Sequence, residues 1–104
     1  MNTLPKYEIA KKVYLGDGTV IVLLNMLGLP DNVPQMDMEQ NIYRVNQQGN
    51  VMWQITGDAP FYPRTPFTGL WYDENNQLMG YRFDGGQYKI DIEAGIASLI
   101  QLIK

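Results

Sequence analysis

The sequence predicts an all-β fold: a small antiparallel β-barrel or sandwich of about six to eight strands, built from consecutive hairpins. Two observations predict it. Turn signals rich in Gly, Asn and Asp recur about every ten residues, and the runs between them are rich in β-branched and aromatic residues. A chain of 104 residues is long enough to bury a core without disulfides, so we expect residues 1–104 to form a single β-barrel domain.

The strands follow from these turn signals, taken in chain order. Asp17-Gly18 lies between two β-branched runs, and such a pair tolerates the positive φ angles of a tight hairpin turn. The predicted strands cover residues 13–15, 19–24, 41–45, 51–55, 70–72, 78–83, 87–92 and 96–103. The last of these also fits one face of a helix, but the Gly95 turn before it favours a strand. Residues 25–40 and 57–68 contain prolines and are predicted to be loops.

Alternation along residues 51–55 predicts a buried tryptophan. In a regular strand Val51, Trp53 and Ile55 share one face, opposite Met52 and Gln54. We therefore expect Trp53 to belong to the core, and its replacement by alanine to cost about 3–5 kcal/mol.

Two segments, residues 20–24 and 96–103, are apolar on both faces of their predicted strands. A single layer around a small core covers only one face, and monomers rarely expose an apolar patch of that size. We therefore expect a homo-oligomer held through one or both segments, with Ile21 or Leu23 facing the partner. The alternative is that residues 25–40, which are rich in Met and Leu, fold over the second face within one chain.

Composition excludes several classes of function. The chain has 8 basic and 11 acidic residues, a net charge of −3, whereas nucleic-acid binding needs a basic surface. The absence of Cys and His removes disulfides, thiol and Ser-His nucleophiles and the usual zinc sites, and we expect no metal site and no cofactor. No run reaches the roughly 18 apolar residues of a membrane span. The N-terminus lacks the apolar core of a signal peptide, so a cytoplasmic location is expected.

An ordered series of residues carries a family resemblance. It consists of residues 41–45, Gly49, Val51, Trp53, residues 66–69 and residues 81–91. This series resembles the C-terminal halves of small stand-alone bacterial β-proteins of uncharacterised function. The resemblance implies a β fold and names no activity.

Asp17 and Asp84 are the candidate catalytic residues. Each stands in an Asp-Gly turn after an apolar strand, which is similar in residue types to the catalytic turns of aspartic-peptidase-like β-barrels, although Gly follows Asp directly here. Two such carboxylates, within one chain or paired across a two-fold axis, share a proton when they lie about 3 Å apart. This chemistry needs neither His nor Cys, so any enzyme here is expected to be an acid peptidase or related hydrolase. The alternative is that both aspartates only shape hairpin turns.

An aromatic, proline-rich loop supplies the candidate ligand-binding residues, which are Phe61, Tyr62, Arg64, Phe67 and Trp71. Aromatic rings and an arginine on a stiff loop suit stacking with a small molecule or a Pro-rich peptide. The same rings can instead plug an open barrel end. The function predicted first is a homo-oligomeric interaction module; the alternatives are the hydrolase and a small-ligand binder.

Overall fold

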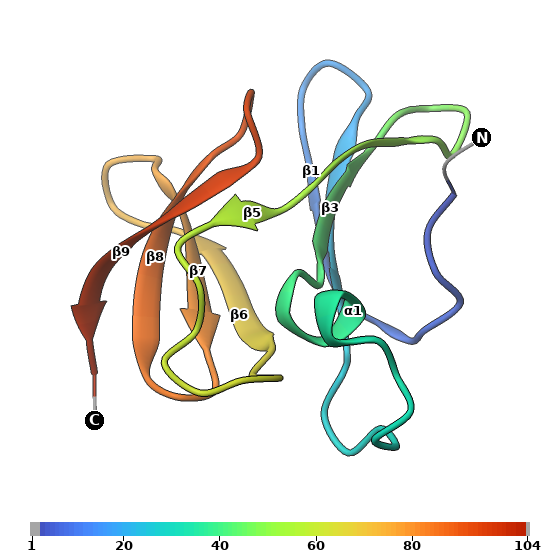
Figure 1. Cartoon of the computed structure of the whole chain (residues 1–104). Coiled ribbons are helices and arrows are strands. Elements are labelled where there is room, and N and C mark those ends of the chain that lie inside the picture. The colour runs from blue at the N-terminus through green and yellow to red at the C-terminus, as the bar shows by residue number, and fades with distance from the viewer. Residues whose placement is uncertain (1–2, 104) are drawn as a thin grey trace.

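The computed structural model describes residues 3–103, which form two β-sheets in a sandwich-like arrangement (Figure 1). The first sheet has the order β1-β2-β3-β4, with β1 (Ile9–Tyr14), β2 (Val20–Leu24), β3 (Ile42–Val45) and β4 (Val51–Gln54). The second has the order β5-β9-β8-β7-β6, with β5 (Thr56–Gly57), β6 (Phe67–Tyr72), β7 (Leu78–Arg82), β8 (Gly86–Asp91) and β9 (Ile96–Leu102). Neighbouring strands are antiparallel except β5 and β9, which are parallel.

The predicted all-β fold is confirmed, and so is the strand assignment of residues 96–103. Several details differ from the prediction: β1 begins at Ile9 rather than at residue 13, β5 was not predicted, and β6 begins at Phe67 within the predicted loop 57–68. The described residues form nine strands in two sheets that do not close into a barrel. Residues 25–40 are not a loop throughout, because they include the short helix α1 (Gln35–Glu39). No helix in the described part of the chain is long and apolar enough to cross a membrane.

The main core lies between the two sheets. Ile21 and Leu23 of β2 point into it, with exposed fractions of 0% and 1%. Its other buried members are Ile42, Ile55, Phe67, Leu70, Leu78, Tyr88, Ile90 and Ala97. The expectation that Ile21 or Leu23 faces outward is therefore wrong.

A second core covers the opposite face of β2. Val22 and Leu24 point into it and are also buried. Met26 and Met38, from the segment between β2 and β3, cover them together with Tyr43. Both faces of β2 are thus buried within one chain, as the alternative expectation had it, and β2 offers no surface to a second subunit.

A β-bulge in β4 separates side chains that a regular strand places together. Trp53 pairs with Arg44 and Val51 pairs with Val45, so Met52 is an extra residue in the strand. Val51 consequently packs against the second core and Trp53 against the first. The expectation that they share a face is wrong, and Trp53 is half-buried at the edge of the core.

Gly95 provides the surface on which Trp53 rests. A Cβ atom at Gly95 would lie 2.4 Å from Cδ2 of the Trp53 ring, so only glycine permits this contact. The indole N–H of Trp53 donates to the Ile92 carbonyl at 2.7 Å. Trp53 therefore fastens the turn between β8 and β9 to the first sheet.

The Asn41 side chain joins the two sheets at the other end of the molecule. Its amide nitrogen donates to the carbonyls of Leu24 and Phe67, both at 2.8 Å, and its oxygen accepts from Phe67 N at 2.9 Å. Asn41 is fully buried. These three hydrogen bonds connect the backbone of β2 at Leu24 to the backbone of β6 at Phe67.

Replacing Asn41 by alanine should lower the free energy of unfolding by roughly 3 kcal/mol or more, because it leaves three buried backbone groups without a partner. Urea unfolding followed by circular dichroism measures the change. Asn32→Ala, at an exposed loop position, is the matched control and should change stability by less than about 0.5 kcal/mol. Equal stabilities of the two variants would contradict the role given to Asn41.

Candidate functional site

Asp17, the first candidate catalytic residue, is engaged in its own turn and in an ion pair. One carboxylate oxygen accepts from the backbone N–H of Thr19 at 3.0 Å and from its hydroxyl at 2.7 Å. The other accepts from Nη2 of Arg44 at 2.7 Å. The hydrogen bonds from Thr19, and after them the Arg44 charge, lower the pKa of Asp17 below its ordinary value. The carboxylate is thus held ionised.

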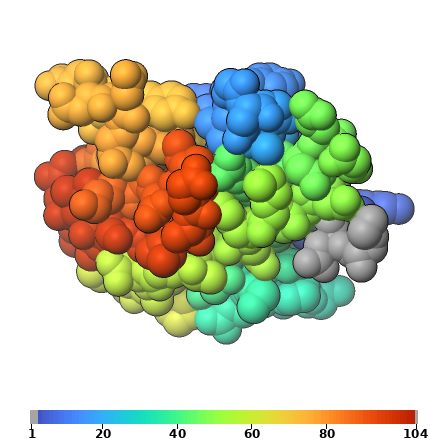
Figure 2. Space-filling view, turned by 90° about the horizontal axis from the view of Figure 1, so that it is seen from above, coloured from blue at the N-terminus to red at the C-terminus, as the bar shows by residue number. Residues whose placement is uncertain are grey.

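Arg44 extends this contact to the second sheet. The guanidinium is buried on β3 and also donates to the Thr19 hydroxyl at 3.0 Å and to the Ile92 carbonyl at 3.2 Å. Glu93, an exposed residue, lies 3.7 Å away. Figure 2, which looks down on this end, shows the orange-red β8–β9 turn beside the blue β1–β2 hairpin. Asp17 therefore orients an arginine that connects the sheets.

Asp84 occupies the β7–β8 turn at the opposite end of the second sheet. Its carboxylate accepts from Gly86 N at 3.2 Å and from Phe61 N at 2.8 Å. Asp17 binds Arg44, which donates to the carbonyl of Ile92, just after the end of β8. Asp84 lies just before the start of β8. Six residues of strand rise roughly 20 Å, and Figure 1 places the two turns at opposite ends. The structure does not bring the two carboxylates together.

The five aromatic-loop candidates do not line one groove either. Phe61 and Tyr62 are exposed at 49% and 63%, whereas Phe67 is buried in the main core. Trp71 is half-buried on β6, where its ring lies beside Gly69. Arg64 takes a positive φ of 66°, and its backbone N–H donates to Glu39 Oε2 at 2.7 Å. The loop is thus anchored by its backbone, and it presents only its first two aromatic rings to solvent.

Arg82 is a buried residue that the sequence analysis did not single out. Its guanidinium carbon lies 4.1 Å from the centre of the Phe67 ring and 4.9 Å from that of Tyr88. Nη1 donates to the Asp58 carbonyl at 2.8 Å and Nη2 to the Glu39 carbonyl at 2.7 Å. The only hint of its burial in the sequence was its position between Tyr81 and Phe83 in an apolar strand. A solvent-facing arginine occurs in the same pattern, so the sequence did not identify Arg82 as buried.

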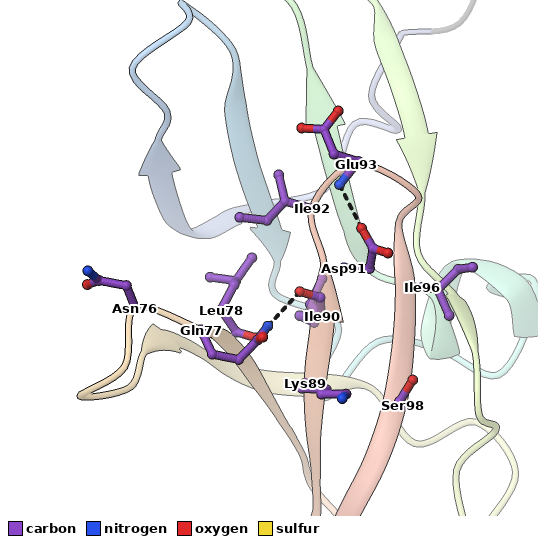
Figure 3. Close-up of a pocket in the computed structure, with 10 residues that line it drawn as sticks. All are labelled: Asn76, Gln77, Leu78, Lys89, Ile90, Asp91, Ile92, Glu93, Ile96 and Ser98. Atoms are coloured by element: carbon purple, nitrogen blue, oxygen red, sulfur yellow. Dashed lines mark hydrogen bonds between the residues drawn. The ribbon is translucent and has the colours of Figure 1, made fainter.

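A pocket with a volume of about 460 Å³ lies at the end of β8 (Figure 3). It is lined by Asn76, Gln77, Leu78, Lys89, Ile90, Asp91, Ile92, Glu93, Ile96 and Ser98. Gln77 Nε2 donates to the Ile90 carbonyl at 2.9 Å, and Asp91 accepts from Glu93 N at 3.0 Å. The pocket is an open groove whose lining carries both signs of charge, from Lys89 and from Asp91 and Glu93.

This groove holds no activated nucleophile. Ser98 stands opposite Lys89 in the ladder of β8 and β9, but Lys89 is exposed, and no hydrogen bond joins the two side chains. A serine becomes reactive only when a base takes its proton. Among residues 3–103 there is also no group of three or more Asp, Glu, His or Cys side chains that could hold a metal ion.

The fold and its surface define a small two-sheet β domain in which Asp17 and Asp84 lie in separate turns of the same chain. The chain matches, over residues 4–102, the model of a family described as a domain of unknown function, DUF7957, and it belongs to that family. Neither the curated proteins nor the solved structures contain a match to this chain.

The lowered pKa of Asp17 predicts a pH dependence of stability. A carboxyl whose pKa is lower in the folded state stabilises the fold above its unfolded pKa of about 3.9, and loses this effect as the pH falls through the folded value. Asp17→Asn should therefore be less stable than the wild type at pH 7, and the difference should shrink as the pH falls below the unfolded pKa of about 3.9. Urea unfolding at several pH values checks this. Asp31→Asn, in an exposed loop, should parallel the wild type; a constant difference between wild type and Asp17→Asn at all pH values would contradict the ion pair.

Proposed function

We propose that this domain is an interaction module that associates with a second copy of itself through the C-terminal end of the second sheet. The observation that carries the proposal is a concentration of exposed apolar side chains there. The C-terminal apolar surface consists of Phe61, Phe83, Ile100, Leu102 and Ile103, with exposed fractions between 41% and 65%.

Hydrogen bonds from backbone N–H groups bring the segments that carry this surface together at the β7–β8 turn. Phe61 N donates to Asp84 in the β7–β8 turn at 2.8 Å, which places Phe61 beside Phe83. Ile103 N donates to the carbonyl of Gly85 in the same turn at 2.6 Å. The turn thus gathers residues from the aromatic loop, from its own tip and from the end of β9. An apolar patch built from three segments is typical of an interaction surface.

The outer edge of β9 supports a strand-mediated contact. β5 pairs only with Ile96 and Ala97, and the Asp58 carboxylate accepts from Leu99 N at 2.8 Å. Beyond Leu99, this edge has no strand partner within residues 3–103. Residues 96–103 also carry no charge. The exposed edge strand β1, in contrast, carries Lys11 and Lys12, and lysines on an edge strand disfavour pairing with a strand of another chain.

A second copy fits this surface because the surface complements itself. Two copies related by a two-fold axis place the same apolar side chains opposite each other, which is the commonest form of soluble assembly. The bulge at Ile100, which has no partner between Leu99 and Gln101, turns that side chain outward to 51% exposure. Ile100 is therefore the position at which a charge should oppose association with the least effect on folding.

Size-exclusion chromatography with light scattering at about 100 μM tests the proposal. The wild type should show a mass that is a multiple of 11.9 kDa. Ile100→Lys should show the single-chain mass with an unchanged circular dichroism spectrum, because a buried lysine without a partner is unfavourable in an interface. Tyr14→Lys, at a residue of β1 that is 75% exposed, is the matched control and should keep the wild-type mass. A wild-type mass of 11.9 kDa, or an assembly that Ile100→Lys leaves intact, would overturn the proposal.

A further inference from the structure

A second pocket lies at the opposite edge of the sandwich and is independent of the C-terminal apolar surface. It has a volume of about 290 Å³ and is lined by Thr3, Pro5, Asp37, Tyr43, Val51, Met52, Trp53 and Gln54. β4, the outermost strand of the first sheet, forms one wall. Asp37 enters from α1, and the N-terminal segment, which bridges to Asn50 through Thr3, forms the third side.

Three polar side chains of this pocket each have a hydrogen-bond donor or acceptor that finds no partner within residues 3–103. Gln54 Nε2 donates to the Gln40 carbonyl at 3.0 Å and to the Tyr43 hydroxyl at 2.9 Å. Both its protons are thereby used, and its oxygen receives no donor from residues 3–103. Asp37 accepts from the Tyr7 hydroxyl at 3.0 Å through one oxygen, and its second oxygen likewise receives no donor from this part of the chain.

The Tyr43 hydroxyl is the buried member of this group. Tyr43 is only 4% exposed, and burial, followed by the charge of Asp37, raises its pKa to about 12. The hydroxyl therefore stays protonated, and its proton meets no acceptor among residues 3–103. Its oxygen accepts from Gln54 Nε2, so Tyr43 helps to hold the Gln54 side chain and contributes no acceptor of its own to a ligand.

The charge of the lining selects the kind of ligand. Among residues 3–103, Asp37 is the only charged residue that lines the pocket, so the described lining carries a negative charge and two oxygen acceptors. The volume lies at or below the lower limit of pockets that hold drug-sized molecules, which restricts the ligand to roughly the size of one side chain. Pro5, Val51 and Met52 supply apolar surface along which an alkyl chain can lie.

We infer that this pocket binds an organic cation with N–H donors on a short alkyl chain, such as an alkylammonium or alkylguanidinium group. Asp37 and the oxygen of Gln54 accept hydrogen bonds from the cation, and the walls of β4 and the N-terminal segment surround the alkyl chain. Lysine and arginine side chains of a peptide and free alkylamines share this chemistry.

Titration with n-butylammonium and n-butylguanidinium chlorides, followed in the ¹H–¹⁵N spectrum, tests the inference. Saturable shifts should be confined to the Gln54 side-chain amide and backbone groups of β4, α1 and the N-terminal segment. The neutral 1-pentanol should not reproduce them. Asp37→Asn should weaken binding at least about tenfold, because a charge-assisted hydrogen bond is lost. Tyr43→Phe, which removes no acceptor from the cation, should change affinity by less than about threefold.

Asp31→Asn is the matched control, since it removes one carboxylate far from the pocket walls and should leave binding unchanged. Affinity should also fall as the sodium chloride concentration rises, because salt screens the attraction, and this measurement decides the question even if Asp37→Asn does not fold. Shifts that do not saturate, equal shifts with 1-pentanol, or binding that is insensitive to both salt and Asp37→Asn would overturn the inference.

Discussion

Three buried polar side chains fix the position of one sheet relative to the other. Asn41, Arg44 and Arg82 are the only buried polar or charged residues in the described part of the chain. Each bonds to a backbone carbonyl beyond its own sheet: Asn41 at the start of β6, Arg44 just after β8, and Arg82 in α1. Because a buried polar group without a partner costs about 1–3 kcal/mol, any shift of one sheet that breaks these bonds is strongly opposed. The apolar side chains between the sheets fill the space, but these three bonds fix the registry.

The two arginines meet the cost of burial in different ways. Arg44 has a carboxylate partner in Asp17, at the solvent boundary, so its charge is compensated. Arg82 has no carboxylate within ion-pair distance among residues 3–103; it relies on two carbonyls and on the faces of two aromatic rings. Its Nε has no hydrogen-bond partner, and that penalty is offset by cation–π attraction in a site shielded from water. Replacing either ring therefore removes part of what makes the buried cation tolerable.

The sequence predicted the turns and most strands because each depends on a few neighbouring residues. Gly18, Gly49, Gly85 and Gly95 all take positive φ in the turns where they were expected. The prediction failed where residues distant in sequence decide the outcome. The bulge at Met52 reverses the alternation along β4, and the coverage of β2 depends on how residues 25–40 fold back. The site prediction faced the same difficulty. It paired Asp17 with Asp84 because both stand in the same local motif, but the distance between them within one chain depends on the length and direction of β8.

The burial of β2 also determines which surface is left for a partner. Two segments were apolar on both faces, and the chain contains one long methionine-rich connection between β2 and β3 that can cover only one of them. That connection starts directly after β2 and returns to β3, and its methionines pack over the outer face of the first sheet, away from β9 of the second sheet. The apolar side chains of β9 therefore have no covering segment within residues 3–103. Their exposure follows from the topology, since β5 pairs with only the first two residues of β9 and no later segment of the described chain returns over the rest of the strand.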